Sequence, residues 1–335
     1  MSGYSWSLAF VFMKNDFIKI DRSIAIAPMI DWTHRHFRYF MRLISQHVLL
    51  YTEMITTSAL LRGDSSRLLD FSEIEHPLAL QLGGSDPKAL AACAKLGEKW
   101  RYDEINFNLG CPSERVKAGC FGAVLMQQPD QVADCLKAMQ DSVDLPVTLK
   151  MRLGLGYEFD QTFLYEFIEK MQQTGCRVFI VHARNAVLKN FSTKDNRHLV
   201  PLRHDIVYQL VKDFPDLTFI LNGGIHTIEE ASVSLEKVSG VMIGRAAYKN
   251  PYEWTKIDSV FFHSEKEIPT RKGIALKYFD YVKMMAEKNI PMSILLKPFI
   301  GLYYQQPLGR HWRTCLMKSQ DIKEKIKELE NLMLI

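Results

Sequence analysis

The most informative segment of this chain is Glu104-Ile-Asn-Phe-Asn-Leu-Gly-Cys-Pro-Ser113. Apolar residues alternate with Asn106 and Asn108, which predicts a short buried strand, and the following Leu-Gly-Cys-Pro predicts a turn. The thiol of Cys111 is therefore expected at the carboxyl end of a strand, where parallel α/β folds carry their chemistry. Since a lone cysteine is more often a small buried hydrophobic residue, this segment alone leaves both interpretations open.

On both sides of this segment, short β-branched or aliphatic runs alternate with longer amphipathic stretches. The expected strands are Ile24–Ala27, Val48–Tyr51, Leu78–Leu82, Glu104–Asn108, Pro146–Lys150, Val178–His182, Thr218–Asn222 and Val241–Ile243. The clearest expected helices are Pro87–Lys99, Gln131–Ser142, Thr162–Gln173, Ile206–Asp213 and Ile228–Leu235. Eight strand–helix units in about 230 residues predict an α/β fold, a (β/α)8 TIM barrel. A doubly wound open sheet is disfavoured, because no G-x-G-x-x-G follows the first strand.

The pattern changes after Tyr252, where three helical stretches follow without another strand. These are Arg271–Lys288, Met292–Tyr304 and Ser319–Met333, with Phe261–Pro269 as a linker. We expect an N-terminal extension over 1–22, a catalytic TIM barrel over 23–260 and an appended C-terminal helical domain over 261–335. Met13-Lys-Asn-Asp is typical of a natural start, so we expect residues 1–12 to be an upstream mis-start or a disordered extension rather than a signal peptide.

Composition and charge restrict the class of protein. The 335 residues are 47% hydrophobic and 24% charged, which is ordinary for a globular chain, and no apolar run is long enough to span a membrane. The six scattered cysteines form no CxxC pair or metal-spaced cluster, so neither a metal site nor a disulfide framework is expected, and the cytoplasm is the expected compartment. From Phe261 onward the chain has 13 Lys and Arg against 8 Asp and Glu, so this part is basic. A basic appendage attracts polyanions, although a solvated helical surface explains the excess charge equally well.

Polar residues at the expected strand ends converge on one face of a barrel. Asn222-Gly-Gly224 and Gly244-Arg245 follow the last two strands, where such barrels usually bind phosphate, and glycines let backbone amides approach it. Lys150 ends a buried strand and therefore needs an anionic partner. A flavin ring offers one, because its N1–C2=O region becomes negative on reduction, and Gln81 can meet the pyrimidine edge of the same ring. His182 is either a ligand of phosphate or ring, or a core histidine bonded to the backbone.

Together these segments resemble the tRNA-dihydrouridine synthase family over nearly the whole of residues 24–316. The matching segments are Ala27-Pro-Met29, Gln81-Leu-Gly-Gly84, Asn106-Phe-Asn-Leu-Gly-Cys-Pro-Ser113, Gly119-Cys-Phe-Gly-Ala-Val-Leu-Met126, Leu149-Lys-Met-Arg152, Val181-His-Ala-Arg184, Asn222-Gly-Gly-Ile225 and Gly244-Arg245. The A-type branch is the nearest match. Its features resemble Ala27-Pro-Met-Ile-Asp-Trp-Thr33, Tyr51-Thr-Glu-Met54, residues 191–202 and Pro307-Leu-Gly-Arg-His-Trp-Arg313.

The resemblance implies FMN as cofactor, NADPH as reductant and uridine at positions 20 and 20a of the tRNA D-loop, near the elbow, as substrate. It assigns FMN contacts to Ala27, Pro28, Met29, Gln81, Lys150, His182, Asn222, Gly223, Gly224, Gly244 and Arg245. It assigns tRNA contacts to Asn108, Lys194, Arg197, Arg310 and Arg313. The chain departs from the usual tail pattern at Leu308 and His311, where relatives more often carry a small residue and a basic one.

The implied reaction moves a hydride from flavin N5 to C6 of a flipped-out uracil. Cys111 matches the proton donor to C5, a role that suits a thiol because a free thiol is a neutral acid at pH 7. Two rival functions are a flavin barrel acting on a free pyrimidine such as dihydroorotate, and a non-catalytic RNA-binding barrel. The first leaves the basic tail unexplained, and intact Cys111, Lys150 and His182 disfavour the second. A monomer is the expected state.

Overall fold

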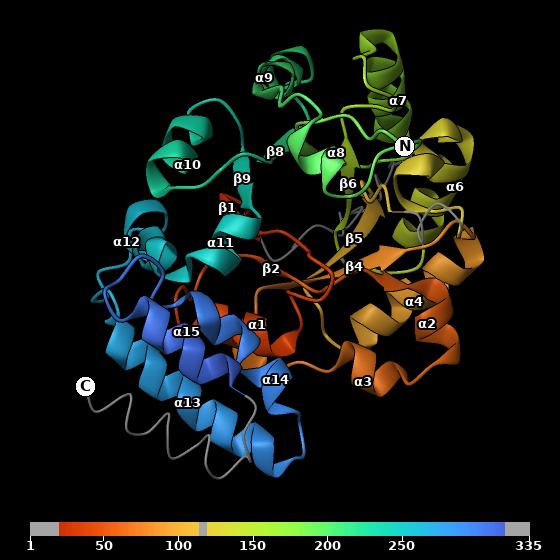
Figure 1. Cartoon of the computed structure of the whole chain (residues 1–335). Coiled ribbons are helices and arrows are strands. Elements are labelled where there is room, and N and C mark those ends of the chain that lie inside the picture. Colours follow the sequence, from red (N-terminus) through yellow and green to blue (C-terminus); the bar gives the residue numbers. More distant parts are fainter. Residues whose placement is uncertain (1–19, 114–118, 319–335) are drawn as a thin grey trace, which may run out of the picture.

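The computed structural model describes residues 20–113 and 119–318. In these residues nine strands form one sheet in which every pair is parallel, in the order β1-β9-β8-β7-β6-β5-β4-β2, with β3 also on β4 (Figure 1). The strands are β1 (Ile24–Ile26), β2 (Leu50–Tyr51), β3 (Ile55–Thr56), β4 (Leu78–Gly83), β5 (Glu104–Leu109), β6 (Val147–Arg152), β7 (Val178–His182), β8 (Thr218–Asn222) and β9 (Gly240–Ile243). An isolated bridge between Ala25 and Leu49 joins the two edges. The predicted (β/α)8 barrel is thereby confirmed.

The second barrel position differs from the expected single strand Val48–Tyr51. It consists of two short strands, β2 and β3, which pair with β4 at successive levels. Between them the backbone N–H of Gln81 donates to the Thr52 hydroxyl at 3.0 Å. A side-chain acceptor here takes the place of a backbone carbonyl, so the regular ladder is interrupted.

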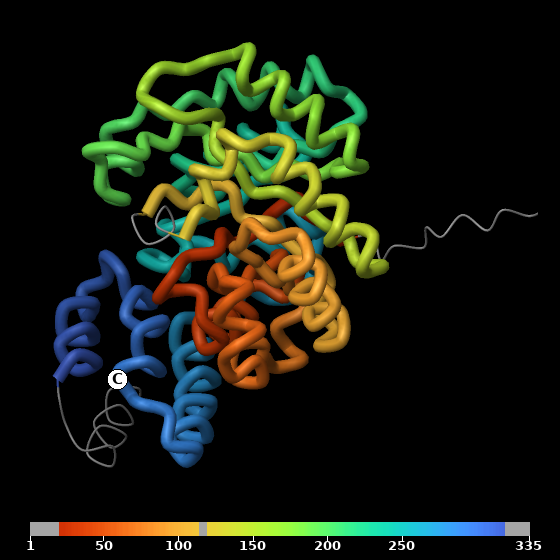
Figure 2. Tube along the Cα trace, turned by 90° about the vertical axis from the view of Figure 1, so that its right-hand side faces the viewer, coloured from red at the N-terminus to blue at the C-terminus, as the bar shows by residue number. Residues whose placement is uncertain are grey.

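Helices surround the barrel (Figures 1 and 2). They are α1 (Arg35–Arg42), α2 (Thr57–Arg62), α3 (Ser65–Leu69), α4 (Pro87–Lys99), α6 (Pro129–Gln140), α7 (Gln161–Gln173), α8 (Asp195–His198), α9 (His204–Asp213), α10 (Ile228–Leu235), α11 (Arg245–Lys249) and α12 (Ile257–Phe261), with 3-10 turns η1 (Glu73–Glu75), η2 (Gly122–Gln127) and η3 (Pro251–Lys256). All five helices named from the sequence are present. Helix α4 illustrates the local signals, because Asp86 accepts a hydrogen bond from Ala89 N at 2.6 Å and Pro87 occupies the first turn.

The C-terminal region contains α13 (Arg271–Glu287), α14 (Met292–Leu295), η4 (Lys297–Gly301) and α15 (Gly309–Met317). It packs on α1: Tyr281 stacks on Tyr39 with ring centroids 3.8 Å apart and bonds His36 Nδ1 at 2.7 Å. The expected single helix Met292–Tyr304 is wrong, since Pro298 lacks the N–H that a helix interior needs and the segment divides into α14 and η4.

Helix α15 was not among the expected helices, and the expected helix Ser319–Met333 lies outside the described residues, as do residues 1–12. None of the helices in residues 20–113 and 119–318 is long and apolar enough to cross a membrane.

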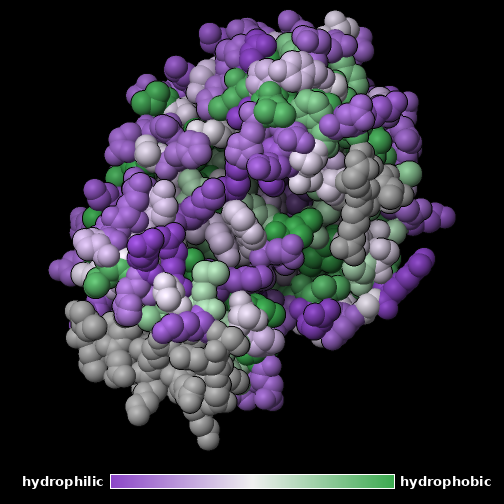
Figure 3. All heavy atoms as spheres, viewed as in Figure 1, coloured by the Kyte–Doolittle hydropathy of each residue, from purple (hydrophilic) through white to green (hydrophobic). Residues whose placement is uncertain are grey.

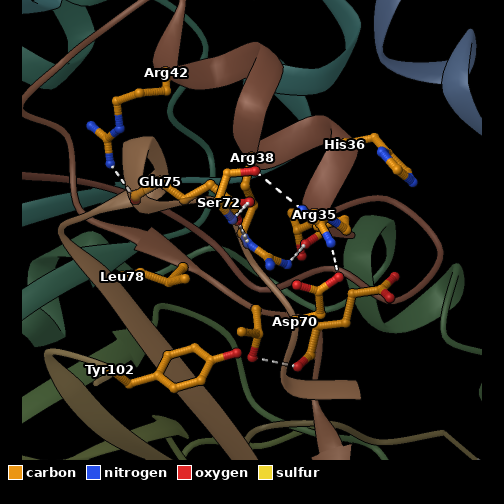
Figure 4. Close-up of polar contacts among 12 residues, drawn as sticks. Arg35, His36, Arg38, Arg42, Asp70, Ser72, Glu75, Leu78 and Tyr102 are labelled. Carbon is orange, nitrogen blue, oxygen red and sulfur yellow. Dashed lines mark hydrogen bonds and ion pairs between the residues drawn. The ribbon is translucent and has the colours of Figure 1, made fainter. Parts of the chain in front are cut away.

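Arginines of α1 fasten the connection between α3 and β4 (Figure 4). The Arg38 guanidinium forms an ion pair with the fully buried Glu75 carboxylate at 2.7 Å and donates to Thr33 O at 2.9 Å. Arg42 donates to Glu75 O at 2.8 Å, and Arg35 forms an ion pair with Asp70. Through Thr33 this cluster also supports the loop that follows β1.

Candidate active site

A column of polar side chains rises through the barrel interior. On β5 the odd-numbered residues pack outward against the helices, while Glu104, Asn106 and Asn108 point inward. At the base, the Glu104 carboxylate pairs with Arg22 at 2.6 Å and accepts hydrogen bonds from Tyr51 OH at 2.8 Å and Thr148 Oγ1 at 2.6 Å. These contacts satisfy a carboxylate that would otherwise be costly to bury.

The column continues to the carboxyl end of the strands. Asn106 Nδ2 donates to Thr148 Oγ1 at 2.9 Å and Asn106 Oδ1 accepts from Gln81 Nε2 at 2.7 Å. Gln81 Oε1 in turn accepts from Asn108 Nδ2 at 2.8 Å. Asn106 is fully buried, and its amide nitrogen and amide oxygen both form hydrogen bonds within the barrel. Gln81, Asn106 and Asn108 each donate one amide proton within this column and retain a second. Asn108, at 8% exposure, is the most accessible of the three to a ligand.

Cys111 lies where the column meets the barrel mouth. Asn108 Oδ1 accepts hydrogen bonds from Gly110 N at 3.2 Å and Cys111 N at 3.1 Å. Arg152, which is buried, donates to Gly110 O at 3.0 Å from the neighbouring strand. The thiol itself is half-buried and lies 3.5 Å from Ser113 Oγ. Backbone contacts on both sides therefore fix the turn while the sulfur remains partly open to the mouth.

Lys150 is a buried cation without a carboxylate partner among the described residues. Its ammonium donates to Asn222 Oδ1 at 3.0 Å, and Asn222 Nδ2 donates to Met242 O at 2.8 Å. Burial first, and the charge of Arg152 second, lower the pKa of Lys150 to about 7, against the opposing effect of nearby Cys111. A buried lysine arranged in this way would be stabilised by an anionic or electron-rich ligand.

His182 and two glycines line the mouth beyond Asn222. Gly223 and Gly224 have φ values of 106° and 77°, which side chains rarely adopt. A Cβ on Gly223 would lie 2.8 Å from His182 Cδ2, and one on Gly224 would lie 2.3 Å from Leu202 Cδ2. Burial and the charges of Arg152 and Lys150 hold the pKa of His182 well below its usual range, so this imidazole is neutral.

Cations gather beside these glycines. Arg245 follows Gly244, where an added Cβ would meet no atom within 4 Å, and Arg245 Nη1 lies 3.0 Å from His198 Nε2. Burial, and after it the charge of Arg197, lower the pKa of Arg245. In the described residues neither Arg184 nor Arg245 forms an ion pair with a carboxylate. An open backbone position beside unneutralised guanidinium groups suits a phosphate.

The loop after β1 borders the same mouth. Ala27 N donates to Ile243 O at 2.8 Å, which holds the loop against β9. Met29 N donates to Thr33 Oγ1 at 3.0 Å. Pro28 and Met29 are half-buried. The loop is thus fixed by its own backbone contacts and presents these two side chains at the rim.

Of the residues expected to contact tRNA, Asn108 lies inside the mouth on β5, and the other four lie on two sides of it. Lys194 and Arg197 are exposed at α8, and Arg310 and Arg313 are exposed on α15. Figure 1 places α8 and α15 across the barrel from one another on the face toward the viewer. Figure 3 shows hydrophobic residues gathered in a hollow near the middle of this face, with mainly hydrophilic residues around it. A polyanion lying across the hollow could reach both groups of cations.

Two contributors were not among the predicted site residues. Arg152 joins the Cys111 turn to the loop after β7 by donating to Gly110 O and to Asn185 O, each at 3.0 Å. Its place in the sequence, as a cation at the end of a buried strand, could have identified Arg152 as a site residue. His198 contacts Arg245 across 47 residues of sequence, and no local pattern predicts that contact. In the described part of the chain, no group of three His, Cys, Asp or Glu side chains could hold a metal ion.

A parallel barrel with a polar interior column, a thiol at its mouth and an adjoining phosphate-compatible rim defines a TIM-barrel enzyme scaffold. The chain belongs to the dihydrouridine synthase (Dus) family, whose profile matches residues 25–334. A protein of Synechocystis sp. named tRNA-dihydrouridine(20/20a) synthase is 47% identical over 88% of this chain and 89% of its own. Proteins of Shewanella oneidensis and Pseudomonas aeruginosa with the same name are 45% and 47% identical, over 91% and 89% of this chain and 91% and 90% of their own.

A solved structure of a mandelate oxidase mutant with an FMN adduct overlaps at a TM-score of 0.43 and 17% identity, covering 69% of this chain and 66% of the other.

Proposed function

We propose that this protein reduces uridine to 5,6-dihydrouridine in tRNA, at D-loop positions 20 and 20a, with FMN as its cofactor and NADPH as the reductant. Membership of the Dus family and the name shared by relatives at 45–47% identity support the reaction and the positions. The observation that carries the chemistry is Cys111, a free thiol fixed by its backbone at the barrel mouth. The tRNA substrate supports a cytoplasmic location, as do cysteines that form no disulfide within the described residues.

The mouth has the donor set that FMN needs. The phosphate would bind at Gly223, Gly224, Gly244 and Arg245, where the backbone is open or adopts positive φ beside unneutralised cations. The ring would lie against Ala27, Pro28 and Met29 and receive hydrogen bonds from Gln81 and Lys150, with Asn222 and His182 at its edge. The carboxylate-free surroundings of Lys150 support this assignment most directly, because an electron-rich ring would satisfy the buried ammonium.

When bound, FMN would supply the hydride equivalent that saturates C6 of the uracil. The protein supplies position and a proton. Asn108, fixed by Gln81 and by the Cys111 turn, would hold the edge of the flipped-out base with its second amide proton. The Cys111 thiol would deliver its proton to C5, near the buried side chains of Lys150 and Arg152.

Lys194 and Arg197 on one side of the mouth, with Arg310 and Arg313 on the other, would bind the tRNA backbone. In this proposal residues 23–260 are the catalytic barrel and residues 261–335 form a tRNA-binding region. The aromatic packing of α13 on α1 supports a fixed position for α13 against the barrel.

The test is dihydrouridine formation in a tRNA transcript incubated with the protein, FMN and NADPH, followed by mapping of the product. Product at positions 20 and 20a is expected. Product elsewhere in the D-loop would retain the reaction and refute the positions. Absence of product, together with turnover of free uracil or dihydroorotate, would establish the rival free-pyrimidine function.

Replacing Lys150 by Met should weaken FMN binding about tenfold to a hundredfold, the contribution of a hydrogen bond to a charged group.

In the free protein the pKa of Lys150 is about 7, so above pH 7 the group is largely neutral. A ligand that favours the ammonium raises this pKa, so binding should take up a proton and weaken as pH rises above 7. Calorimetry in two buffers of different ionisation enthalpy measures that uptake. Equal uptake by the Lys150→Met variant would contradict the assignment.

Arg310→Ala and Arg313→Ala should each weaken tRNA binding and reduce the slope of log K against log salt by roughly 0.7–0.9, the value for one phosphate contact. Filter binding over a range of salt concentrations gives the slopes. The matched control is Lys212→Ala, an exposed cation at the C-terminal end of α9, remote from the mouth. Unchanged slopes in both arginine variants would remove α15 from the proposed tRNA surface.

A further inference from the structure

A second pocket opens beside the mouth, between the segments that follow β6 and β7. Its volume is about 270 Å³, near the lower end of the ~300–1,000 Å³ of small-molecule sites. Tyr157, Phe159 and Val200 supply apolar and aromatic walls, and Glu158, Asn185 and Arg203 supply polar groups. Tyr157 is 51% exposed. An exposed aromatic ring over a small pocket is the form in which proteins stack a single unpaired nucleobase.

Asn185 gives the pocket a polar preference. Asn185 is 4% exposed. Its side-chain Nδ2 donates to Glu158 O at 2.6 Å, and its backbone carbonyl accepts from Arg152 Nη1 at 3.0 Å. Its Oδ1 is buried and accepts no hydrogen bond, and an unpaired buried acceptor is destabilising until a ligand satisfies it. The Glu158 carboxyl group, exposed beside it, is a second acceptor. Two acceptors suit a ligand that brings amino protons.

Arg203 forms the cationic side of the pocket. The Arg203 guanidinium bonds Asp205 at 2.8 Å and lies 5.8 Å from the centre of the Phe159 ring. Arg203 N also donates to Ala183 O at 2.8 Å, which ties the pocket to the end of β7. The backbone bond fixes where Arg203 stands, and its guanidinium adds a cation beside the Phe159 ring.

The pocket is connected to the Cys111 turn. Arg152 bonds the carbonyls of both Gly110 and Asn185, and its Nη1 lies 3.4 Å from Asn196 O in α8. Helix α8 carries Arg197, one of the cations assigned to the tRNA backbone. An RNA chain that places one base at Cys111 and its backbone on α8 therefore passes this pocket.

Resting on the function proposed above, we propose that this pocket binds a second unpaired base of the substrate tRNA, one that carries an exocyclic amino group. The base stacks on Tyr157 and directs its amino group to Asn185 Oδ1. Adenine, guanine and cytosine have such a group and uracil has none, so the pocket distinguishes the neighbour from the target base. Its occupation would set which D-loop uridine reaches Cys111.

The experiment uses flavin-loaded full-length protein and tRNA transcripts in which each unpaired D-loop nucleotide, one at a time, is abasic. Both the Kd for tRNA and kcat/KM for dihydrouridine formation are measured with wild type and Tyr157→Ala. At one position the abasic change should weaken binding to wild type about tenfold, within the range for one stacked base. Tyr157→Ala should lose the same factor on intact tRNA and nothing further on that abasic tRNA, whereas Tyr157→Phe should behave as wild type.

If the loss of affinity from Tyr157→Ala and the loss from the abasic change multiply at every position, the Tyr157 ring and the missing base act independently. That result would overturn the proposal. A uracil at the mapped position binding as well as the natural amino-bearing base would overturn the role of Asn185. Val233→Ala, an exposed apolar residue on α10, is the matched control. Because the Kd cycle needs no product, a wild type that forms no dihydrouridine refutes the proposed function separately from the pocket.

Discussion

Replacing Cys111 by Ala should reduce dihydrouridine formation by about 10²–10⁴-fold, the contribution of one general acid. Binding of FMN and tRNA should be unchanged, because the contacts that hold the turn are made by the backbone. Cys111 N donates to Asn108 Oδ1, and Cys111 O accepts from Ala123 N at 3.0 Å; both remain in alanine. Single-turnover measurement with pre-reduced protein isolates the step that needs the proton.

The matched control is Cys120→Ala. Cys120 is an exposed free thiol nine positions along the same segment, with a φ of 53° that alanine tolerates no worse than cysteine. Its variant should react at the wild-type rate. If Cys111→Ala also kept full single-turnover activity, another group would have to be the acid. If it lost its FMN, the thiol would be a structural or flavin-contacting group.

The barrel could be predicted from sequence because each strand is marked locally. In the sequence, a strand buried on both faces is a short aliphatic run, and the helices between the strands have capping residues and an apolar face. Helix α15 escaped prediction because its signal is tertiary: Trp312 donates to Phe299 O at 2.8 Å and stacks edge-on against Phe299. The division of the second strand escaped because it depends on Thr52 meeting Gln81, whose strand is 29 residues further along the chain.

Individual site residues could be proposed from their place at strand ends, but their partners could not. Barrel register sets Gln81 beside Asn106, Asn108 beside Lys150 and His182 beside Asn222. Register follows from the closure of the whole sheet, which no single segment encodes. This is why the sequence did not predict the hydrogen bonds that join Asn106 to Gln81 and Thr148.

Replacing Arg38 by Met should destabilise the fold by about 3–5 kcal/mol, because it leaves the Glu75 carboxylate buried without its cation. Glu75 is fully buried and keeps only the hydrogen bond from Ser72 N, at 2.7 Å, on its other oxygen. Urea unfolding of the flavin-free protein measures the change. The double variant Arg38→Met/Glu75→Leu should recover most of the loss, since replacing both members of a buried pair by apolar groups is nearly neutral.

The control is Lys137→Met, which removes one member of an exposed pair with Asp141 on α6 and should cost less than about 1 kcal/mol. If Lys137→Met and Arg38→Met lost equal free energy of unfolding, the buried Glu75 carboxylate would have to be stabilised by a group other than Arg38. The double variant separates a second effect, because it restores the charge balance without restoring the bond from Arg38 to Thr33 O. That bond supports the loop bearing Pro28 and Met29, so the double variant should be nearly as stable as wild type and still bind FMN more weakly.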